Sequence, residues 1–421
     1  MSVAVKSKLI SIEKILQARA RLKNVVRNTP TEYNAGLSER YGANIYLKRE
    51  DLQIVRSYKI RGAYNKMASL SADQKKKGIV AASAGNHAQG AALSCKLLSV
   101  HGKIFMPTPT TEQKVNKVKS FGKDMVEVVL VGDTFDDAYA AAMKDCEENG
   151  KAFIHPFEDR KVIEGQGTVG AEIMDEVTGP IDYLLLPIGG GGLSAGVGSY
   201  IKTLSPSTKI IGAEPAGAPA MHTSRANGKW TALDHIDKFV DGAAVKAVGK
   251  LNFDICQEVF DDILLVPEGK VCTTVLELYN NEGIIVEPAG ALTTASLDLI
   301  KDEIKGKTVV CVVSGGNNDI VRMAEIRERS MLYEGRKQYF IVKFPQRAGA
   351  LREFLVEVLG PKDDIVLFEY TKKTARENGP ALIGIELKKK EDYDALIARM
   401  DQYNVNYQLL NNQPELFGML I

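Results

Sequence analysis

Two glycine-rich segments follow apolar runs in this sequence, and both have the residue types of an anion-binding loop. One covers residues 83–90 and the other residues 189–196, and each precedes a stretch of helix-forming residues. The free backbone N–H groups at the start of such a helix would face an anion. In the second segment, the four glycines at 189–192 remove every Cβ where the backbone has to wrap around an oxyanion. Read alone, the first segment is also compatible with a plain strand-to-helix turn capped by Asn86.

Two further segments supply an amine and a hydroxyl group. Lys59 lies in SYKIRGA at residues 57–63, although a lysine is most often a solvated surface charge. Ser314 opens SGGNND at residues 314–319, directly after the strongest β-run of the chain. We expect all four segments to be loops at the ends of strands, which is where parallel sheets bind ligands.

The second glycine segment also matches a different kind of binding site. Gly190, Gly192 and Ala195 fit the dinucleotide fingerprint loosely. Glu214 stands 24 positions beyond the first of these glycines, about where a ribose-binding acid would lie. An NAD-dependent oxidoreductase is therefore an alternative, whereas the lack of a G-K-[ST] sequence excludes a Walker phosphate loop.

The composition is that of an ordinary globular enzyme of two or three domains. The chain has 421 residues, 54 of them Lys or Arg and 53 Asp or Glu, so its formal net charge is +1. Near-neutrality argues against nucleic acid as a partner, because phosphate binding needs a surplus of basic residues. Five cysteines without a C-x-x-C pair predict buried thiols in a reducing cytoplasm. The histidines form no zinc pattern, so we predict no metal site.

Short apolar runs alternate with helical patterns over residues 12–330, which predicts an α/β fold with a parallel sheet covered on both faces. The uncharged stretch at 183–201 contains six glycines and Pro187, so it reads as a strand and a glycine loop and not as a membrane span. The predicted strands are 79–82, 103–106, 125–130, 183–186, 209–212 and 309–313, with helices such as 134–149 and 167–177 between them.

The order of predicted strands and helices changes after a predicted helix at 319–333 and a predicted hinge at 334–336. We expect strands at 338–344, 365–372, 381–387 and 405–410, and helices at 348–359 and 391–403. The order β-α-β-β-α-β is that of a ferredoxin-like domain. The sequence therefore predicts a catalytic domain at residues 1–333 and a separate module at residues 336–421.

Taken together, SYKIRGA, SAGNHAQG, GGGGLSAG and SGGNND resemble one family, the biosynthetic threonine dehydratases, also called threonine ammonia-lyases. EPAGAPAM at 214–221 and EPAGA at 287–291 match that family too, and the resemblance covers the whole chain. It implies a fold of the tryptophan-synthase-β type, with two open parallel-sheet subdomains and a C-terminal ACT-like regulatory domain. It implies pyridoxal 5'-phosphate as cofactor, and dehydration and deamination of L-threonine to 2-oxobutanoate and ammonia, the first step toward isoleucine.

The resemblance also assigns roles to residues. Lys59 would form the Schiff base with the cofactor and then act as the base at the substrate Cα. Asn86 would bind the ring hydroxyl oxygen, and Ser314 the pyridine nitrogen. The residues that would hold the cofactor phosphate are Gly189, Gly190, Gly191, Gly192 and Leu193. Those that would hold the substrate carboxylate are Ser83, Ala84, Gly85, Asn86 and His87, with Ser83 also counted as catalytic.

The hydroxyl of Ser314 favours one type of reaction over others. A neutral group at the pyridine nitrogen leaves that nitrogen unprotonated, so a carbanion at Cα is stabilised less and prompt loss of a β-leaving group competes well. Elimination from a β-hydroxy amino acid therefore fits better than transamination. Serine dehydratases and serine racemases share much of the SAGNH form, so L-serine is an alternative substrate.

The C-terminal module carries the family's turn into its first helix at FPQRAGAL, residues 344–351, with Ala348 where proline is usual. The resemblance implies isoleucine as an inhibitor, valine as its opponent, and a homotetramer in the cytoplasm. A packing or oligomerisation domain without an effector is the alternative, because a fold does not fix a function.

Overall fold

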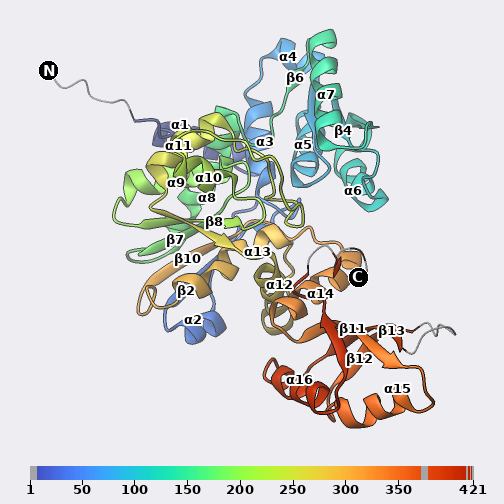
Figure 1. Ribbon diagram of the computed structural model, residues 1–421. Helices are drawn as coiled ribbons and strands as arrows, with labels where there is room; N and C mark the ends of the chain where they lie inside the picture. The colour runs from blue at the N-terminus through green and yellow to red at the C-terminus, as the bar shows by residue number, and fades with distance from the viewer. Residues whose placement is uncertain (1–6, 371–377, 414–415, 418, 420–421) are drawn as a thin grey trace. The chain divides into compact units, whose positions relative to one another are not determined.

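The computed structural model describes residues 7–370, 378–413, 416–417 and 419. The chain divides into two compact units, Met1–Asp319 and Ile320–Ile421. Figure 1 shows the elements of both units. The hinge predicted at 334–336 lies inside the second unit, after the helix α14 (Met323–Tyr333).

The first unit contains two separate sheets. The larger one has the strand order β1 (Thr31–Tyr33), β2 (Asn44–Arg49), β10 (Thr308–Val313), β7 (Tyr183–Pro187), β8 (Lys209–Pro215) and β9 (Asp262–Val266). The smaller one has the order β5 (Val126–Leu130), β4 (Gly102–Met106), β3 (Ile79–Ala82) and β6 (Ala152–Phe153). Every neighbouring pair is parallel except β1 with β2. The two parallel-sheet subdomains implied by the sequence are thus confirmed.

Helices cover both sheets, and α5, α6 and α7 gather around the smaller one (Figure 1). The helices of the first unit are α1 (Ile12–Leu22), α2 (Ala35–Tyr41), α3 (Lys59–Ala68), α4 (Ala72–Lys77), α5 (Asn86–Leu98), α6 (Glu112–Gly122), α7 (Phe135–Asn149), α8 (Arg160–Glu176), α9 (Gly192–Leu204), α10 (Ala220–Ala226), α11 (Lys250–Val259), α12 (Glu268–Glu282) and α13 (Pro288–Ala295). Short 3-10 turns are η1 (Glu50–Leu52), η2 (Lys123–Met125) and η3 (Ser296–Ile300).

Local sequence explains where several of these helices begin. Thr134 and Asp137 form a capping box at the start of α7, close to the predicted bounds. Helix α8 begins earlier than the sequence predicts, because the Asp159 side chain accepts hydrogen bonds from the backbone N–H groups of Lys161 and Val162. The predicted helix at 167–177 is therefore the second half of α8.

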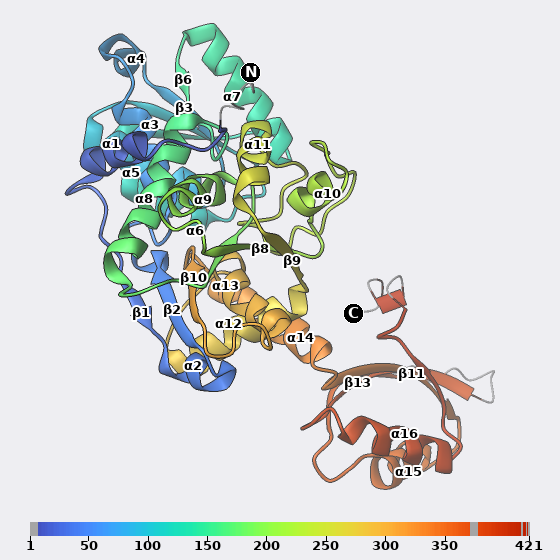
Figure 2. The same ribbon diagram turned by 90° about the vertical axis from the view of Figure 1, so that its left-hand side faces the viewer.

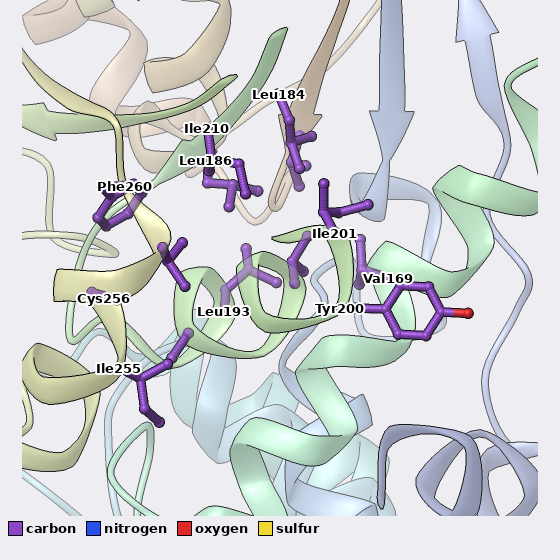
Figure 3. Packing of buried hydrophobic residues seen from close by; sticks show 14 of the residues in the cluster. Val169, Leu184, Leu186, Leu193, Tyr200, Ile201, Ile210, Ile255, Cys256 and Phe260 are labelled. Atoms are coloured by element: carbon purple, nitrogen blue, oxygen red, sulfur yellow. The ribbon is translucent and has the colours of Figure 1, made fainter. Parts of the chain in front are cut away.

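The core of the larger subdomain surrounds α9. Leu193 and Ile201 of this helix lie in one apolar cluster with Leu184 and Leu186 of β7 and Ile210 of β8, as Figure 3 shows. On the other side α9 packs against α8, and the two helices lie side by side in Figure 2. Glycines on both helices permit this close approach, since a Cβ at position 196 would overlap the carbonyl oxygen of position 163.

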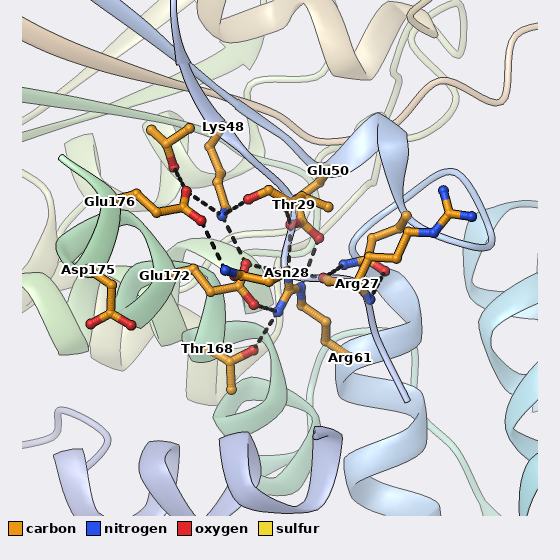
Figure 4. A network of polar contacts seen from close by, with 12 residues as sticks. Arg27, Asn28, Thr29, Lys48, Glu50, Arg61, Thr168, Glu172, Asp175 and Glu176 are labelled. Atoms are coloured by element: carbon orange, nitrogen blue, oxygen red, sulfur yellow. Dashed lines mark hydrogen bonds and ion pairs between the residues drawn. The ribbon is translucent and has the colours of Figure 1, made fainter. Parts of the chain in front are cut away.

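A buried network of charges joins α3, α8 and the end of β2 (Figure 4). The Arg61 guanidinium donates to both carboxylate oxygens of Glu50, at 2.7 and 2.8 Å, and to both oxygens of Glu172, at 2.6 and 2.7 Å. The Lys48 ammonium lies 2.9 Å from Glu172. Opposite charges balance within the network, which is what burial of ions requires. The network fixes the first turn of α3, the helix that begins at Lys59.

The second unit is a four-stranded antiparallel sheet with helices. Its elements are η4 (Ile320–Arg322), α14, β11 (Lys337–Pro345), α15 (Ala350–Glu353), the π-helical turn η5 (Phe354–Val358), β12 (Asp364–Tyr370), β13 (Asn378–Glu386), α16 (Asp392–Gln402) and β14 (Asn406–Leu409). The strand order β12-β13-β11-β14 confirms the predicted ferredoxin-like arrangement. The last two residues of the strand predicted at 365–372 lie outside the described residues.

Within the described parts of the chain, no helix is long and apolar enough to cross a membrane. The five cysteines are all buried as free thiols, as the sequence predicts.

Candidate functional site

The four segments singled out in the sequence come together in the first unit. Three of them directly follow the strands β3, β7 and β10, and the fourth follows β2 through the turn η1. The backbone N–H of Tyr58 donates to the carbonyl oxygen of Ser314 at 3.2 Å, and Ser57 pairs with Gly315 in an isolated β-bridge. The amine segment and the SGGNND segment are therefore direct neighbours.

Lys59 is the first residue of α3, so its segment is a helix and not the loop that the sequence analysis predicted. The Lys59 ammonium donates to the carbonyl oxygen of Pro156 at 2.9 Å and lies over the ring of Tyr58, 5.3 Å from its centroid. Burial lowers the pKa of Lys59 to about 8, against the opposing effect of the Glu287 carboxylate. Near neutral pH, a useful fraction of this amine is unprotonated and can act as a nucleophile or base.

The segment after β3 presents hydrogen-bond donors from the start of α5. Gly85 is the N-cap residue of that helix and Asn86 its first residue, so Asn86 is not the cap that the simpler interpretation of this turn required. The Ser83 hydroxyl accepts a hydrogen bond from the backbone N–H of Gly85 at 3.1 Å. No acceptor among the described residues takes the N–H groups of Asn86 and His87. A Cβ added at position 85 would meet nothing within 4 Å, so space lies beside these donors.

His87 is buried and neutral in this arrangement. Its Nε2 lies 2.7 Å from the carbonyl oxygen of Ile154, which fixes that nitrogen as the protonated one. Burial, with the nearby charge of Lys59, lowers the pKa of His87 to about 3. The His87 imidazole therefore anchors the loop to the backbone of Ile154. The group that His87 can offer to a ligand is its backbone N–H.

The glycine segment forms a second set of donors at the start of α9. Gly191 has φ +85°, a left-handed conformation that glycine adopts without strain. A Cβ at Gly190 would overlap the ring of Phe157, so the backbone approaches this side chain too closely for any other residue. Within the described chain, the N–H groups from Gly189 to Leu193 meet no acceptor. Five donors at one helix start suit a doubly charged oxyanion.

Ser314 lies at the end of β10 with 4% of its surface exposed. Its hydroxyl donates to the carbonyl oxygen of Ala289 at 3.3 Å, and its oxygen can still accept a hydrogen bond. The residue next to it, Gly315, lies so close to Glu287 that a Cβ there would overlap the carboxylate oxygen Oε1.

Two residues of the site were not singled out from the sequence. Glu287 is the N-cap residue of α13, and its Oε1 accepts a hydrogen bond from the Asn86 side chain at 2.5 Å. Burial, with the negative charge of Asp241, raises the pKa of Glu287 to about 7. Asn317 donates to the Asn86 side-chain oxygen at 2.7 Å. Both belong to quoted segments, EPAGA and SGGNND, but nothing in the sequence showed that their side chains meet Asn86.

Comparison with family models divides the chain into two regions, much as the structure divides it into two units. A model described as "Pyridoxal-phosphate dependent enzyme" matches residues 22–315. A second, described as "C-terminal regulatory domain of Threonine dehydratase", matches residues 328–420.

Similar proteins are found among both curated sequences and solved structures. The chain is 59% identical over 412 residues to the L-threonine dehydratase biosynthetic IlvA of Halalkalibacterium halodurans, covering 98% of this chain and 99% of that one. It is 58% identical to the protein of the same name from Bacillus subtilis, with 98% of both chains covered. The structure of threonine deaminase isoform 2 from Solanum lycopersicum is 39% identical with a TM-score of 0.72, over 77% of this chain and 96% of that chain. A serine racemase from Dictyostelium discoideum is 31% identical with a TM-score of 0.69, over 75% and 100%.

Proposed function

This chain belongs to the pyridoxal-phosphate-dependent enzymes and, within them, to the biosynthetic L-threonine dehydratases, and on that premise we propose how its residues carry out the reaction. The enzyme depends on pyridoxal phosphate, converts L-threonine to 2-oxobutanoate and ammonia, and acts in isoleucine biosynthesis. One observation carries the residue assignments: contacts join the segments that follow β2, β3, β7 and β10, which hold a buried amine, a carboxamide, a hydroxyl and two clusters of backbone donors. The dinucleotide alternative is dropped, because the glycine segment lies inside the region matched by the pyridoxal-phosphate family.

The residues at this site fit the cofactor. The donors from Gly189 to Leu193, which find no acceptor within the described chain, suit its phosphate. The Asn86 carboxamide suits the ring oxygen. The Ser314 hydroxyl suits an unprotonated pyridine nitrogen if its single hydrogen turns from the Ala289 carbonyl oxygen to that nitrogen. Lys59 supplies the amine that reacts with its aldehyde.

Bound pyridoxal phosphate supplies an aldehyde carbon that takes up amines and a conjugated ring that accepts the electrons released at the substrate Cα. The protein residues bind the substrate and move its protons. The Lys59 amine, freed when the substrate amine takes its place, would remove the proton from Cα and return it to the β-hydroxyl, which then leaves as water. Burial that holds the pKa of Lys59 near 8 suits this base, because its neutral form is then accessible at physiological pH.

Residues 83–87 would hold the substrate carboxylate. The N–H groups of Asn86 and His87 point out of the first turn of α5 and bear the positive end of its dipole. Ser83 and Ala84 lie beside them at the end of β3, and the Gly85 position leaves room for the ligand. Fixing the carboxylate here orients the Cα–H bond toward the base, which is how positioning lowers the barrier.

L-Serine is a second candidate substrate, because two of the structural relatives at 31% and 30% identity are serine racemases. The same elimination from serine gives pyruvate and ammonia. The ratio of kcat/KM for threonine and serine decides which substrate is the better one.

The test uses the purified protein loaded with pyridoxal phosphate. We expect L-threonine to yield equal amounts of 2-oxobutanoate and ammonia, and a Lys59→Ala variant to lose at least about 10³-fold in kcat. Lys66→Ala is the control, since Lys66 lies two helical turns along α3 and pairs with Asp159. A Lys59→Ala variant with undiminished turnover would contradict the assignment of the base.

We further propose that the second unit binds isoleucine as an inhibitor, opposed by valine. A cavity of about 450 Å³ lies at the turn from β11 to α15. Leu351, Leu355 and Val356 line it with apolar side chains. Arg347 also lines it, and although this guanidinium pairs with Glu353, its remaining N–H groups can bind a carboxylate. This chemistry suits a branched-chain amino acid.

We also propose that the enzyme is a homotetramer of the cytoplasm. Val356 leaves apolar surface exposed on the second unit, which favours pairing with another copy. Five free thiols suit a reducing compartment. Sedimentation of the holoenzyme across a range of concentrations tests the number of subunits.

A further inference from the structure

Four side chains form a hydrogen-bonded series with a fixed direction: Lys117, Asn317, Asn86 and Glu287. The Asn317 Nδ2 donates to the backbone carbonyl oxygen of Val55 at 2.8 Å and to Asn86 Oδ1 at 2.7 Å. The Lys117 ammonium lies 3.3 Å from Asn317 Oδ1. Because a carbonyl only accepts and an ammonium only donates, the Asn317 carboxamide has one possible orientation.

The orientation of Asn317 then determines that of Asn86. Asn317 donates an N–H, so the Asn86 side chain must accept it with its oxygen Oδ1. The nitrogen of the Asn86 carboxamide then points away from Asn317. That nitrogen donates to Glu287 Oε1 at 2.5 Å. A carboxamide has two N–H groups. One is used by Glu287, and the other is left for a ligand.

Glu287 is held firmly as the acceptor at the end of this series. Glu287 is 7% exposed, and its Oε1 packs against the bare backbone of Gly315. Its environment includes the negative Asp241 and the positive Lys114 and Lys59, and burial raises its pKa to about 7. Both the neutral and the ionised carboxyl can accept the Asn86 N–H through Oε1.

We propose that Glu287 and Asn317 are positioning residues for the dehydratase reaction: they lock the Asn86 carboxamide so that its second N–H, and not its oxygen, meets the ring oxygen of pyridoxal phosphate. This inference rests on the proposed function and extends it by two residues. An N–H donated to the ring oxygen stabilises its deprotonated form, whereas a carboxamide turned around would set two oxygens against each other.

The test measures equilibrium binding of pyridoxal phosphate to the apoenzyme and the visible absorption of the bound cofactor. Asn317→Asp keeps the shape of the side chain and removes its donor, so Asn86 should turn its nitrogen toward the new carboxylate. We expect binding to weaken by about tenfold or more, the effect of one charge-assisted hydrogen bond, and the absorption maximum to shift.

Asn34→Asp is the matched control. Asn34 also donates to a glutamate, Glu282 at 2.8 Å, and accepts from the backbone N–H of Leu37 at 2.7 Å, but it caps α2 and is no part of the site. This variant should lose thermal stability without changing cofactor affinity or absorption. Equal effects of Asn34→Asp and Asn317→Asp on cofactor binding would overturn the proposal.

A second pair of variants at Glu287 decides the matter if Asn317→Asp does not fold. Glu287→Gln keeps an acceptor oxygen and should bind the cofactor nearly as the unaltered protein does, whereas Glu287→Leu should show the weakened binding and shifted absorption. Equal damage from both substitutions would overturn the positioning role. If the unaltered protein itself bound no pyridoxal phosphate or left threonine intact, the proposed function would fail instead, so the two failures are distinguishable.

Discussion

His87 carries a stability cost that depends on pH. Its pKa is about 3 in the folded protein, because the ring is buried beside Lys59, against an ordinary value of 6.5. Between these two values the unfolded chain binds the proton and the folded protein does not. The free energy of unfolding therefore falls as the pH drops from 6.5 toward 3, by up to about 1.4 kcal/mol per pH unit from this group.

We predict that His87→Gln flattens this acid loss of stability. Glutamine offers an N–H to the carbonyl oxygen of Ile154 but does not titrate, so the variant should lose less stability than the unaltered protein over this range. Chemical denaturation of the apoprotein at several pH values measures the slope. His101→Gln, at an exposed histidine, is the control. Parallel slopes for His87→Gln and the unaltered protein would show that His87 is not the group responsible.

Ser314→Asp should change what the enzyme does after Cα has lost its proton. An aspartate would protonate the pyridine nitrogen and prolong the carbanion, and it would also stand near the Glu287 carboxylate. We expect dehydration to slow by about tenfold or more and racemisation of threonine at Cα to rise. Formation of 2-oxobutanoate and chiral chromatography of the remaining threonine measure the two rates. Ser314→Ala is the control. Unchanged rates in Ser314→Asp would contradict the proposed contact between Ser314 and the pyridine nitrogen.

Site residues could be identified from the sequence only where they stand in a segment with a recognisable pattern. Lys59, Asn86 and Ser314 stand in recognisable segments, and the structure brings their segments together. Glu287 and Asn317 stand in such segments too, yet their contact with Asn86 depends on side-chain directions across 201 and 231 residues of chain. Periodicity and spacing do not contain that information.

At the scale of elements, the glycine loop before α9 depends on backbone conformation. A Cβ at Gly191 would point at the Asn252 Cβ, 3.0 Å away, and the Met221 methyl, 3.2 Å away, so the conflict it creates is inside the protein. A left-handed φ adds a cost of about 1–2 kcal/mol for any residue with a Cβ.

We predict that Gly191→Ala weakens pyridoxal-phosphate binding by about tenfold, because the strained loop no longer aims its N–H groups at one point. Gly179→Ala is the matched control, since Gly179 also has a positive φ, +95°, and its Cβ would meet nothing within 4 Å. Equilibrium titration of the apoenzymes with pyridoxal phosphate compares them. The loop assignment is wrong if the two variants bind the cofactor equally well.

Two strands that were not predicted from the sequence, β2 and β6, show the limits of prediction from hydrophobic patterns. Strand β2 ends in Lys48 and Arg49, and charged residues normally indicate exposure. Both are buried here because acidic side chains pair with them: Glu172 of the distant helix α8 pairs with Lys48, and Asp51, two residues further along the chain, pairs with Arg49. Strand β6 has only two residues, too few for a pattern. Apolar strands such as β3 and β10, by contrast, were predicted almost to the residue.

At the scale of the whole molecule, control by isoleucine requires two states with different affinities. Isoleucine inhibits only if it binds the less active state more tightly, typically by about 1–3 kcal/mol. The second unit has its own core, built around Phe340, Ile383 and Met400. An effector bound there can therefore shift an equilibrium without touching the catalytic residues.

We predict that Leu355→Asp abolishes the effect of isoleucine while leaving threonine turnover intact. The new carboxylate would repel that of the effector and remove an apolar contact from the cavity wall. Threonine saturation curves with and without isoleucine measure the response. Val366→Asp is the control, because Val366 is similarly exposed in the same unit, 39% against 43%, and does not line the cavity. Inhibition that survives in Leu355→Asp would place the effector elsewhere.

The charge network behind Lys59 also restricts how this sequence can evolve. Lys48, Glu50, Arg61 and Glu172 are 0 to 5% exposed, and each compensates a charge on another. Losing one partner of such a pair costs about 3–5 kcal/mol, a large share of the stability of a typical domain, whereas replacing the whole set by apolar residues is often neutral. Sequences in which only some of the four residues have been replaced are therefore destabilised, whereas sequences that keep all four or replace all four are not. Strong epistasis should hold these four positions, so that descendants of this gene either keep all of them or change them together.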